Sequence, residues 1–120
     1  MNLNQVTLPA IDIAASVAFY RLMGFSQVVN APQYARFACP SGTATFSVRY
    51  KSEFVAESGV VVYFETERLD EKVKSLQALG LVFTQEPKDE PWLWREARLK
   101  DPAGNTICLY SAGENRKNPS

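Results

Sequence analysis

The sequence predicts an α+β domain made of two copies of one module, each with the order strand, helix, strand, strand, strand. Segments of alternating polarity, typical of strands, flank one segment of helical spacing in each half of the chain. A constant shift in numbering aligns the halves, with Gln5 falling on Val61, Gly24 on Gly80 and Phe25 on Leu81. Neither half buries its helix face alone, so the two modules are expected to form a curled mixed sheet with a concave cup.

In the first module, residues 3–8 alternate and predict a strand that stops at Pro9. Asp12 is a favourable N-cap, and Gly24 is placed to end the helix that follows. Three further strands are expected, over residues 25–29, 34–38 and 43–50.

In the second module, a helix is predicted by an apolar stripe that ends before Gly80 and consists of Leu69, Val73, Leu76 and Leu79. Residues 86–91 contain two prolines and are expected to form a loop. Strands are expected over residues 60–66, 81–84, 93–99 and 106–110, the last after a tight turn at residues 101–105.

The polar segment 51–58 is the predicted linker between the modules. The modules therefore cover about residues 1–52 and 58–112 of one domain, 1–112. The polar tail, residues 113–120, is expected to fray.

The composition argues against several classes of partner. Thirteen basic residues balance thirteen acidic ones, which argues against a nucleic acid or an anionic membrane as partner. The sequence has no apolar run of the ~20 residues that span a bilayer and no recognisable secretory signal. The two cysteines, Cys39 and Cys108, lie far apart and suggest reduced thiols in the cytoplasm.

Strand alternation assigns side chains to the cup. A register slip of one residue would exchange the whole set. The candidate ligand-binding residues on this face are Gln5, Ser47, Arg49, Val61, Tyr63, Glu65, Trp94, Glu96, Cys108 and Tyr110.

These residues describe an amphipathic cup with aromatic walls and a few charges, as small-molecule sites usually have. Glu96 and Arg98 also fit a solvated rim in which the charges only pair with each other. Gln5 is as easily explained by a hydrogen bond to a neighbouring strand, and Cys108 by apolar packing. No catalytic residue is assigned.

Two motifs resemble one known family. The first is Ser16-Val-Ala-Phe-Tyr-Arg-Leu-Met-Gly-Phe25, and the second is Asp101-Pro-Ala-Gly-Asn-Thr-Ile-Cys-Leu-Tyr110. In this order and spacing, within a repeated module, they resemble the vicinal oxygen chelate superfamily, which includes glyoxalase I, extradiol dioxygenases and bleomycin-resistance proteins. The resemblance implies the glyoxalase/bleomycin-resistance type of fold, and a homodimer in which modules pair across subunits.

Most enzymes of that superfamily hold a divalent metal with His, Gln and Glu, but this chain has no histidine. The resemblance places the four ligand positions at Gln5, at Ser47 (or Phe46, after a one-residue slip), at Val61 and at Cys108. Only Gln5 is a ligand of the family's type, so no metal site is assigned.

Three functions follow as hypotheses. The first is a metal-free protein that binds and sequesters a small aromatic or amphipathic molecule, similar to the bleomycin-resistance group. The alternative is a metal-dependent glyoxalase-like lyase or dioxygenase whose unusual divalent-ion ligands include Gln5 and acids from Glu65 or Glu96. The third is a structural or regulatory dimer whose cup holds only water.

Overall fold

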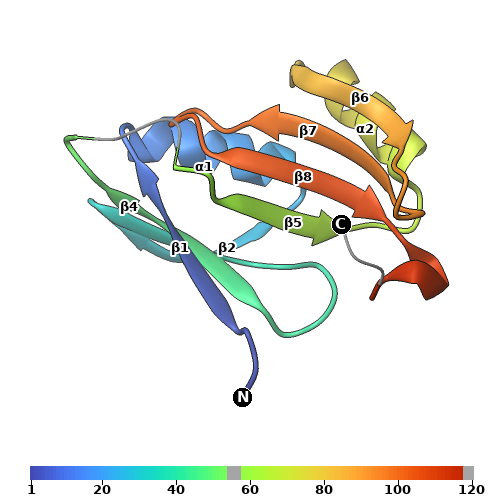
Figure 1. Ribbon diagram of the computed structural model, residues 1–120. Coiled ribbons are helices and arrows are strands. Elements are labelled where there is room, and N and C mark those ends of the chain that lie inside the picture. The colour runs from blue at the N-terminus through green and yellow to red at the C-terminus, as the bar shows by residue number, and fades with distance from the viewer. Residues whose placement is uncertain (54–57, 118–120) are drawn as a thin grey trace. The chain divides into compact units, whose positions relative to one another are not determined.

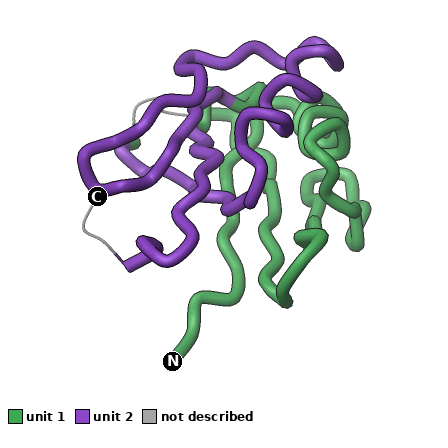
Figure 2. The backbone as a smooth tube through the Cα atoms, turned by 90° about the vertical axis from the view of Figure 1, so that its right-hand side faces the viewer, with its two compact units in different colours: residues 1–58, 101–105 green, residues 59–100, 106–120 purple. Residues whose placement is uncertain are grey.

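The computed structural model describes residues 1–53 and 58–117 of the 120-residue chain. The chain divides into two compact units (Figure 2). Unit 1 comprises Met1–Ser58 with Asp101–Asn105, and unit 2 comprises Gly59–Lys100 with Thr106–Ser120. The turn at residues 101–105 thus belongs to unit 1, although its sequence neighbours on both sides belong to unit 2.

Unit 1 contains one helix and a four-stranded mixed sheet (Figure 1). Its elements in chain order are β1 (Gln5–Ala10), α1 (Ile13–Leu22), β2 (Ser26–Ala31), β3 (Tyr34–Ala38) and β4 (Thr45–Tyr50). The strand order is β1-β4-β3-β2, with β1 parallel to β4 and the other pairs antiparallel.

Unit 2 repeats this arrangement. Its elements are β5 (Val61–Glu65), α2 (Leu69–Ala78), β6 (Phe83–Asp89), β7 (Arg95–Lys100), β8 (Thr106–Ser111) and the short 3₁₀ helix η1 (Gly113–Asn115). The strand order β5-β8-β7-β6 matches that of unit 1 element for element. The α+β class and the twice-repeated module are therefore confirmed.

Both helices begin and end largely as the sequence predicts. Asp12 caps α1 by accepting a hydrogen bond from the Ala15 amide at 3.1 Å. Gly24 and Gly80, one after each helix, have φ angles of 104° and 98°, a left-handed conformation that favours glycine. The stripe of α2 is buried except at Leu79, which is 55% exposed because α2 ends at Ala78.

The core of unit 1 is aromatic. Tyr20 on α1 packs against Phe37 and Phe46, with ring centroids 5.5 and 4.9 Å away. The Tyr20 hydroxyl donates to Asp101 Oδ2 at 2.6 Å, while Asp101 Oδ1 accepts from the amides of Ala103 and Asn105. Asp101 therefore both shapes its own turn and fastens that turn to the helix of unit 1.

Two of the predicted boundaries were wrong because of proline. β1 continues through Pro9, and β6 extends over residues 86–89, where a loop was expected. Both strands lie at the edge of their sheets, where a proline on the side that faces away from the neighbouring strand removes no ladder hydrogen bond. Around Pro87, the pairing of β6 with β7 also shifts register between Gln85 and Lys88, as proline in a strand often requires.

The predicted tail begins with a short ordered element. Residues 113–115 form η1, and the Trp94 indole donates to the Asn115 carbonyl at 2.7 Å. Residues 118–120 of the predicted tail, and residues 54–57 of the predicted linker, lie outside the described residues. Across residues 1–53 and 58–117, no helix is long and apolar enough to cross a bilayer.

Candidate functional site

The sheet face of unit 1 that points away from α1 carries a network of neutral polar side chains. The register pairs Gln5 with Thr45 and Thr7 with Ser47. Gln5 Nε2 donates to Ser47 Oγ at 2.8 Å, and the Thr45 hydroxyl donates to Gln5 Oε1. The Ser47 hydroxyl lies 2.8 Å from that of Thr7 and is fully buried. Both ends of the Gln5 amide are therefore occupied within the sheet.

Beside this network, on the same face, lie Tyr34 and Arg36 of β3 and Arg49 of β4. The two arginines bring positive charge to this face. Arg49 Cζ lies 4.8 Å from the ring centroid of Tyr34, and Arg36 Nε donates to the Tyr34 hydroxyl at 3.0 Å. A hydrogen bond from Ser47, and the Arg36 guanidinium, hold the pKa of Tyr34 below its ordinary value. Of these three residues, only Arg49 is among the ten predicted ligand-binding residues, although alternation against the buried Ala35 and Phe37 also places Tyr34 and Arg36 on this face.

Unit 2 gathers three of the predicted residues into an aromatic cluster. Trp94 and Tyr110 stack with ring centroids 4.4 Å apart and planes inclined by 16°. Tyr63 meets both edge-on, at 6.2 and 5.8 Å. Tyr110 is buried, whereas Tyr63 is 40% exposed. The cluster thus presents aromatic surface to solvent at Tyr63 while its other rings are held by packing.

Glu96 lies next to this cluster and is only 1% exposed, so the alternative of a solvated rim is wrong for this residue. Its Oε2 accepts from the Trp92 indole at 2.8 Å. Its Oε1 lies 3.4 Å from an Arg98 nitrogen and 3.6 Å from Cys108 Sγ. Arg98 also reaches the Tyr63 hydroxyl at 3.4 Å, and so connects the buried carboxylate to the aromatic cluster.

Glu65 takes part in an ion pair at the other end of the cluster. Arg116 Nε donates to Glu65 Oε1 at 3.1 Å, and both side chains are exposed. With the bond from Trp94 to the Asn115 carbonyl, this pair joins the segment after β8 to the aromatic cluster. Asn115 and Arg116 therefore border this face of unit 2.

Cys108 is fully buried and packs with Tyr110 and Ala112, against Val61 and Trp94. Burial, and then the negative charge of Glu96, raise the pKa of its thiol to about 12. A thiol with this pKa stays protonated at neutral pH, and is therefore not a reactive nucleophile.

The four positions that correspond to metal ligands do not suit a divalent ion. The Gln5 oxygen already accepts from Thr45, and Ser47 offers a neutral hydroxyl. Val61 has no donor atom, and Cys108 is a protonated thiol. Across residues 1–53 and 58–117, no three His, Cys, Asp or Glu side chains gather where they would hold a metal ion. No step of a reaction is therefore assigned to a metal.

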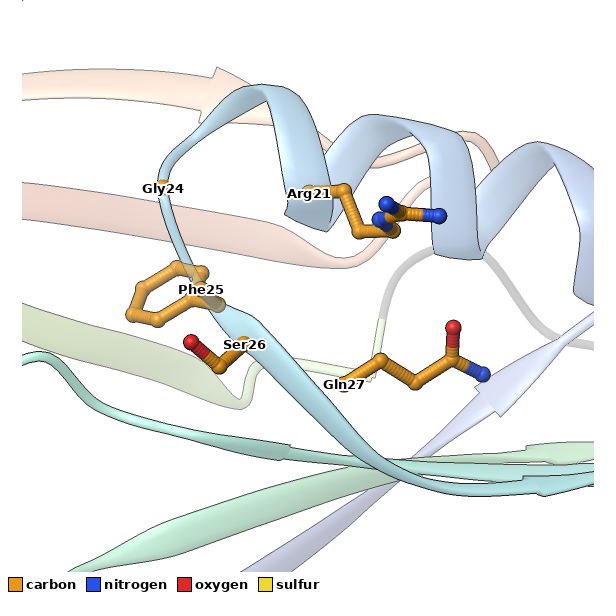
Figure 3. A pocket seen from close by; sticks show the side chains of 5 residues that line it. All are labelled: Arg21, Gly24, Phe25, Ser26 and Gln27. Carbon is orange, nitrogen blue, oxygen red and sulfur yellow. The ribbon is translucent and has the colours of Figure 1, made fainter.

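A separate hollow of about 540 Å³ opens on unit 1 at the junction of α1 and β2. Figure 3 shows its lining, in which the side chains of Arg21 and Gln27 extend to one side and the Phe25 ring lies on the other. The remaining lining residues are Gly24 and Ser26. None of the ten predicted ligand-binding residues lines it.

Comparison with known proteins identifies the family. Residues 2–109 match the Glyoxalase/Bleomycin resistance protein/Dioxygenase superfamily. No curated protein sequence matches significantly.

Solved structures with the same fold include a bleomycin resistance determinant encoded on the transposon Tn5, with a TM-score of 0.78 and 19% identity, over 92% of this chain and 98% of that one. A lactoylglutathione lyase from Agrobacterium tumefaciens gives a TM-score of 0.75 and 22% identity, over 92% of each chain. A bleomycin-binding protein complexed with bleomycin gives a TM-score of 0.76 and 19% identity, over 92% of this chain and 98% of that one. The match of the family to nine-tenths of the sequence, together with this shared fold, shows that the chain belongs to the Glyoxalase/Bleomycin resistance protein/Dioxygenase superfamily.

Proposed function

We propose that the protein binds a small aromatic or amphipathic molecule without the help of a metal ion, and sequesters it. The observation that carries this proposal is the aromatic cluster of Tyr63, Trp94 and Tyr110, which lies on the sheet face of unit 2 that points away from α2. A flat apolar ligand gains the most from such a surface, because stacking adds to the burial of apolar area.

The charges around the cluster suit an amphipathic ligand. Arg98 lies beside Tyr63, and the exposed pair of Glu65 and Arg116 borders the rings at the other end. Each positive group already has a carboxylate partner within unit 2, so this face has no strong net charge. A few polar groups around an aromatic surface fix the orientation of a ligand, and the apolar surface supplies most of its affinity.

The donor chemistry at Gln5, Ser47, Val61 and Cys108 supports binding over metal-dependent catalysis. The likeness in fold to a bleomycin-binding protein is consistent with this role. The alternative, a metal-dependent lyase or dioxygenase, is favoured by one contact. Cys108 and the Glu96 carboxylate lie 3.6 Å apart, so a soft metal that displaced the thiol proton would find two ligands there.

A matched pair of variants tests the binding proposal. Tyr63 and Tyr50 are each 40% exposed, but only Tyr63 belongs to the aromatic cluster. Titration with 2-naphthol and with bleomycin, followed by tryptophan fluorescence, is expected to show binding that Tyr63→Ala weakens about tenfold, since burying one large apolar side chain contributes about 1.5–3 kcal/mol. Tyr50→Ala should bind like the wild type. Equal affinities in all three proteins would refute the aromatic cluster as the site.

Elemental analysis tests the metal-free part of the proposal. Protein purified without a tag, then incubated with Ni, Zn, Mn or Fe(II) and desalted, is expected to retain far less than one ion per chain. Stoichiometric metal that is lost in Glu65→Gln or Glu96→Gln would overturn the proposal and favour the enzyme.

We also propose that the protein is a cytoplasmic homodimer. Its two cysteines are free thiols, which suits a reducing compartment. β2 lies at the edge of its sheet and exposes Val28 and Val29, and an exposed apolar edge favours pairing with a second chain. Light scattering after gel filtration should give twice the chain mass of 13.4 kDa. The chain mass itself at every concentration would contradict the dimer.

A further inference from the structure

The strands of unit 1 differ from those of unit 2 in their charges. The sequences of β1, β2, β3 and β4 contain no Asp or Glu, but they contain Arg36 and Arg49. All four arginines of unit 2 form salt bridges: Arg68, Arg95, Arg98 and Arg116. Within residues 1–53 and 58–117, neither Arg36 nor Arg49 has a carboxylate at that distance. The strands of unit 1 therefore carry two arginine charges that no described carboxylate neutralises.

The register brings these two charges together on one face. β3 pairs with β4 so that Tyr34 lies opposite Arg49, and Arg36 lies opposite Ser47. The two guanidinium carbons lie 4.8 Å (Arg49) and 5.8 Å (Arg36) from the centroid of the same Tyr34 ring. Like charges repel, so two arginines held at one ring favour an anion that compensates them both.

The neighbouring groups suit an anion as well. A guanidinium that rests on an aromatic ring keeps N–H donors at its edge, where they match the oxygens of a carboxylate or phosphate. Arg49 is exposed and Arg36 half-buried, so both are within reach of a small molecule. The remaining groups of this face, Gln5, Thr7, Thr45 and Ser47, are neutral and bond to one another, and so bring no opposing negative charge. The pKa of Tyr34 is lowered first by a hydrogen bond from Ser47 and then by Arg36 and Arg49.

We propose that the face of unit 1 formed by Tyr34, Arg36 and Arg49 binds an oxyanion, either a carboxylate or a phosphate carried by a small molecule. Arg36 and Arg49 supply the charge and the paired donors, and Tyr34 holds the two side chains in place. This site consists of residues of unit 1 alone, and the proposal stands whether or not the aromatic cluster of unit 2 binds a ligand.

Nuclear magnetic resonance of the arginine side chains tests the site directly. The whole chain, labelled with ¹⁵N, is titrated in separate experiments with inorganic phosphate and with acetate, with sodium chloride adjusted to keep the ionic strength constant. The Nε–H signals of Arg36 and Arg49 are expected to shift and saturate with at least one of the two anions. Saturation by phosphate alone or by acetate alone identifies the class of oxyanion.

Arg49→Gln should weaken this binding about tenfold, since a hydrogen bond between charged groups contributes about 1.5–3 kcal/mol. Arg49→Lys, which keeps the charge but loses the paired donors, should give an intermediate affinity. Arg21→Gln is the matched control, because it removes the same charge from unit 1 at the hollow beside α1. The proposal is wrong if neither anion gives saturable shifts at Arg36 and Arg49, or if Arg21→Gln weakens binding as much as Arg49→Gln does. Circular dichroism of each variant establishes that it is folded.

Discussion

Replacing Glu96 by glutamine tests whether the buried carboxylate stabilises unit 2. Three donors contact it within the described residues: the Trp92 indole, the Arg98 guanidinium and the Cys108 thiol. A carboxylate only accepts, so it satisfies all three together. Glutamine has the same shape, but an NH₂ group replaces one of the two carboxylate oxygens. This NH₂ group then faces a donor, either the Trp92 indole or the Arg98 guanidinium.

The expected loss is about 2 kcal/mol of unfolding free energy. Hydrogen bonds to a charged group contribute about 1.5–3 kcal/mol each, about twice as much as those between neutral groups. Glu96 is 1% exposed, so solvent replaces little of what is lost. The contact with Arg98 is long, at 3.4 Å, and the Arg98 side chain is 30% exposed, so its share is at the low end. In a domain of this size the loss lowers Tm by roughly 8 °C.

Guanidinium chloride unfolding, followed by far-ultraviolet circular dichroism, measures this loss without relying on the nearby tryptophans. Glu86→Gln is the control, because Glu86 is exposed and accepts one hydrogen bond, from Gln77; it should change the stability by less than about 0.5 kcal/mol. Unfolding of Glu96→Gln at or above the wild-type midpoint, with the same slope, would refute the reasoning. It would mean that the desolvation of the charge offsets the hydrogen bonds.

Three further predictions concern other parts of the chain. Tyr20→Phe removes the buried hydroxyl that donates to Asp101 and should reduce the stability to urea by about 1–3 kcal/mol, whereas Tyr50→Phe should not; equal midpoints would contradict this. The ¹³Cβ chemical shift of Cys108 should keep its thiol value up to the highest pH at which the protein stays folded, because the pKa of this buried thiol is about 12. Glu96→Gln should lower that pKa by removing a negative charge that opposes ionisation, and a titration of the wild-type shift at the ordinary thiol pKa of about 8.5 would contradict the prediction. Leu93 has a φ of 68°, so Leu93→Asn should raise the stability by about 0.5–1 kcal/mol; a lower Tm would contradict that.

The repeat was predictable because each module repeats the same physical pattern. Alternation marks strands, the spacing of Leu69, Val73 and Leu76 marks a helix, and a glycine follows each helix. The extent of β1 and β6 was not predictable, because proline is tolerated only at a sheet edge and the sequence does not reveal which strands are edges.

The candidate site was likewise predictable where alternation along a strand decides the position of a side chain, and not where a tertiary contact decides it. Alternation placed Tyr63 and Tyr110 together, because they share one face of the neighbouring strands β5 and β8, and Trp94 lies directly before β7. The burial of Glu96 depends on an indole four residues earlier that reaches back to it, and a one-dimensional pattern does not contain that contact. Arg36 follows the same alternation, because its neighbours Ala35 and Phe37 on the expected strand are buried, so this residue too was predictable from the sequence. That these residues bind a ligand stays a prediction.

The turn at residues 101–105 affects how this chain folds as it leaves the ribosome. The Tyr20 hydroxyl donates to Asp101, which lies 81 positions later in the sequence, and the Pro9 carbonyl accepts from Asn105, which lies 96 positions later. A nascent chain that ends at residue 58 has made every strand of unit 1 but lacks these partners. Contacts so distant in sequence slow folding. Unit 1 therefore reaches its full stability only after β7 has been synthesised, and an isolated N-terminal half should be a poor folding unit.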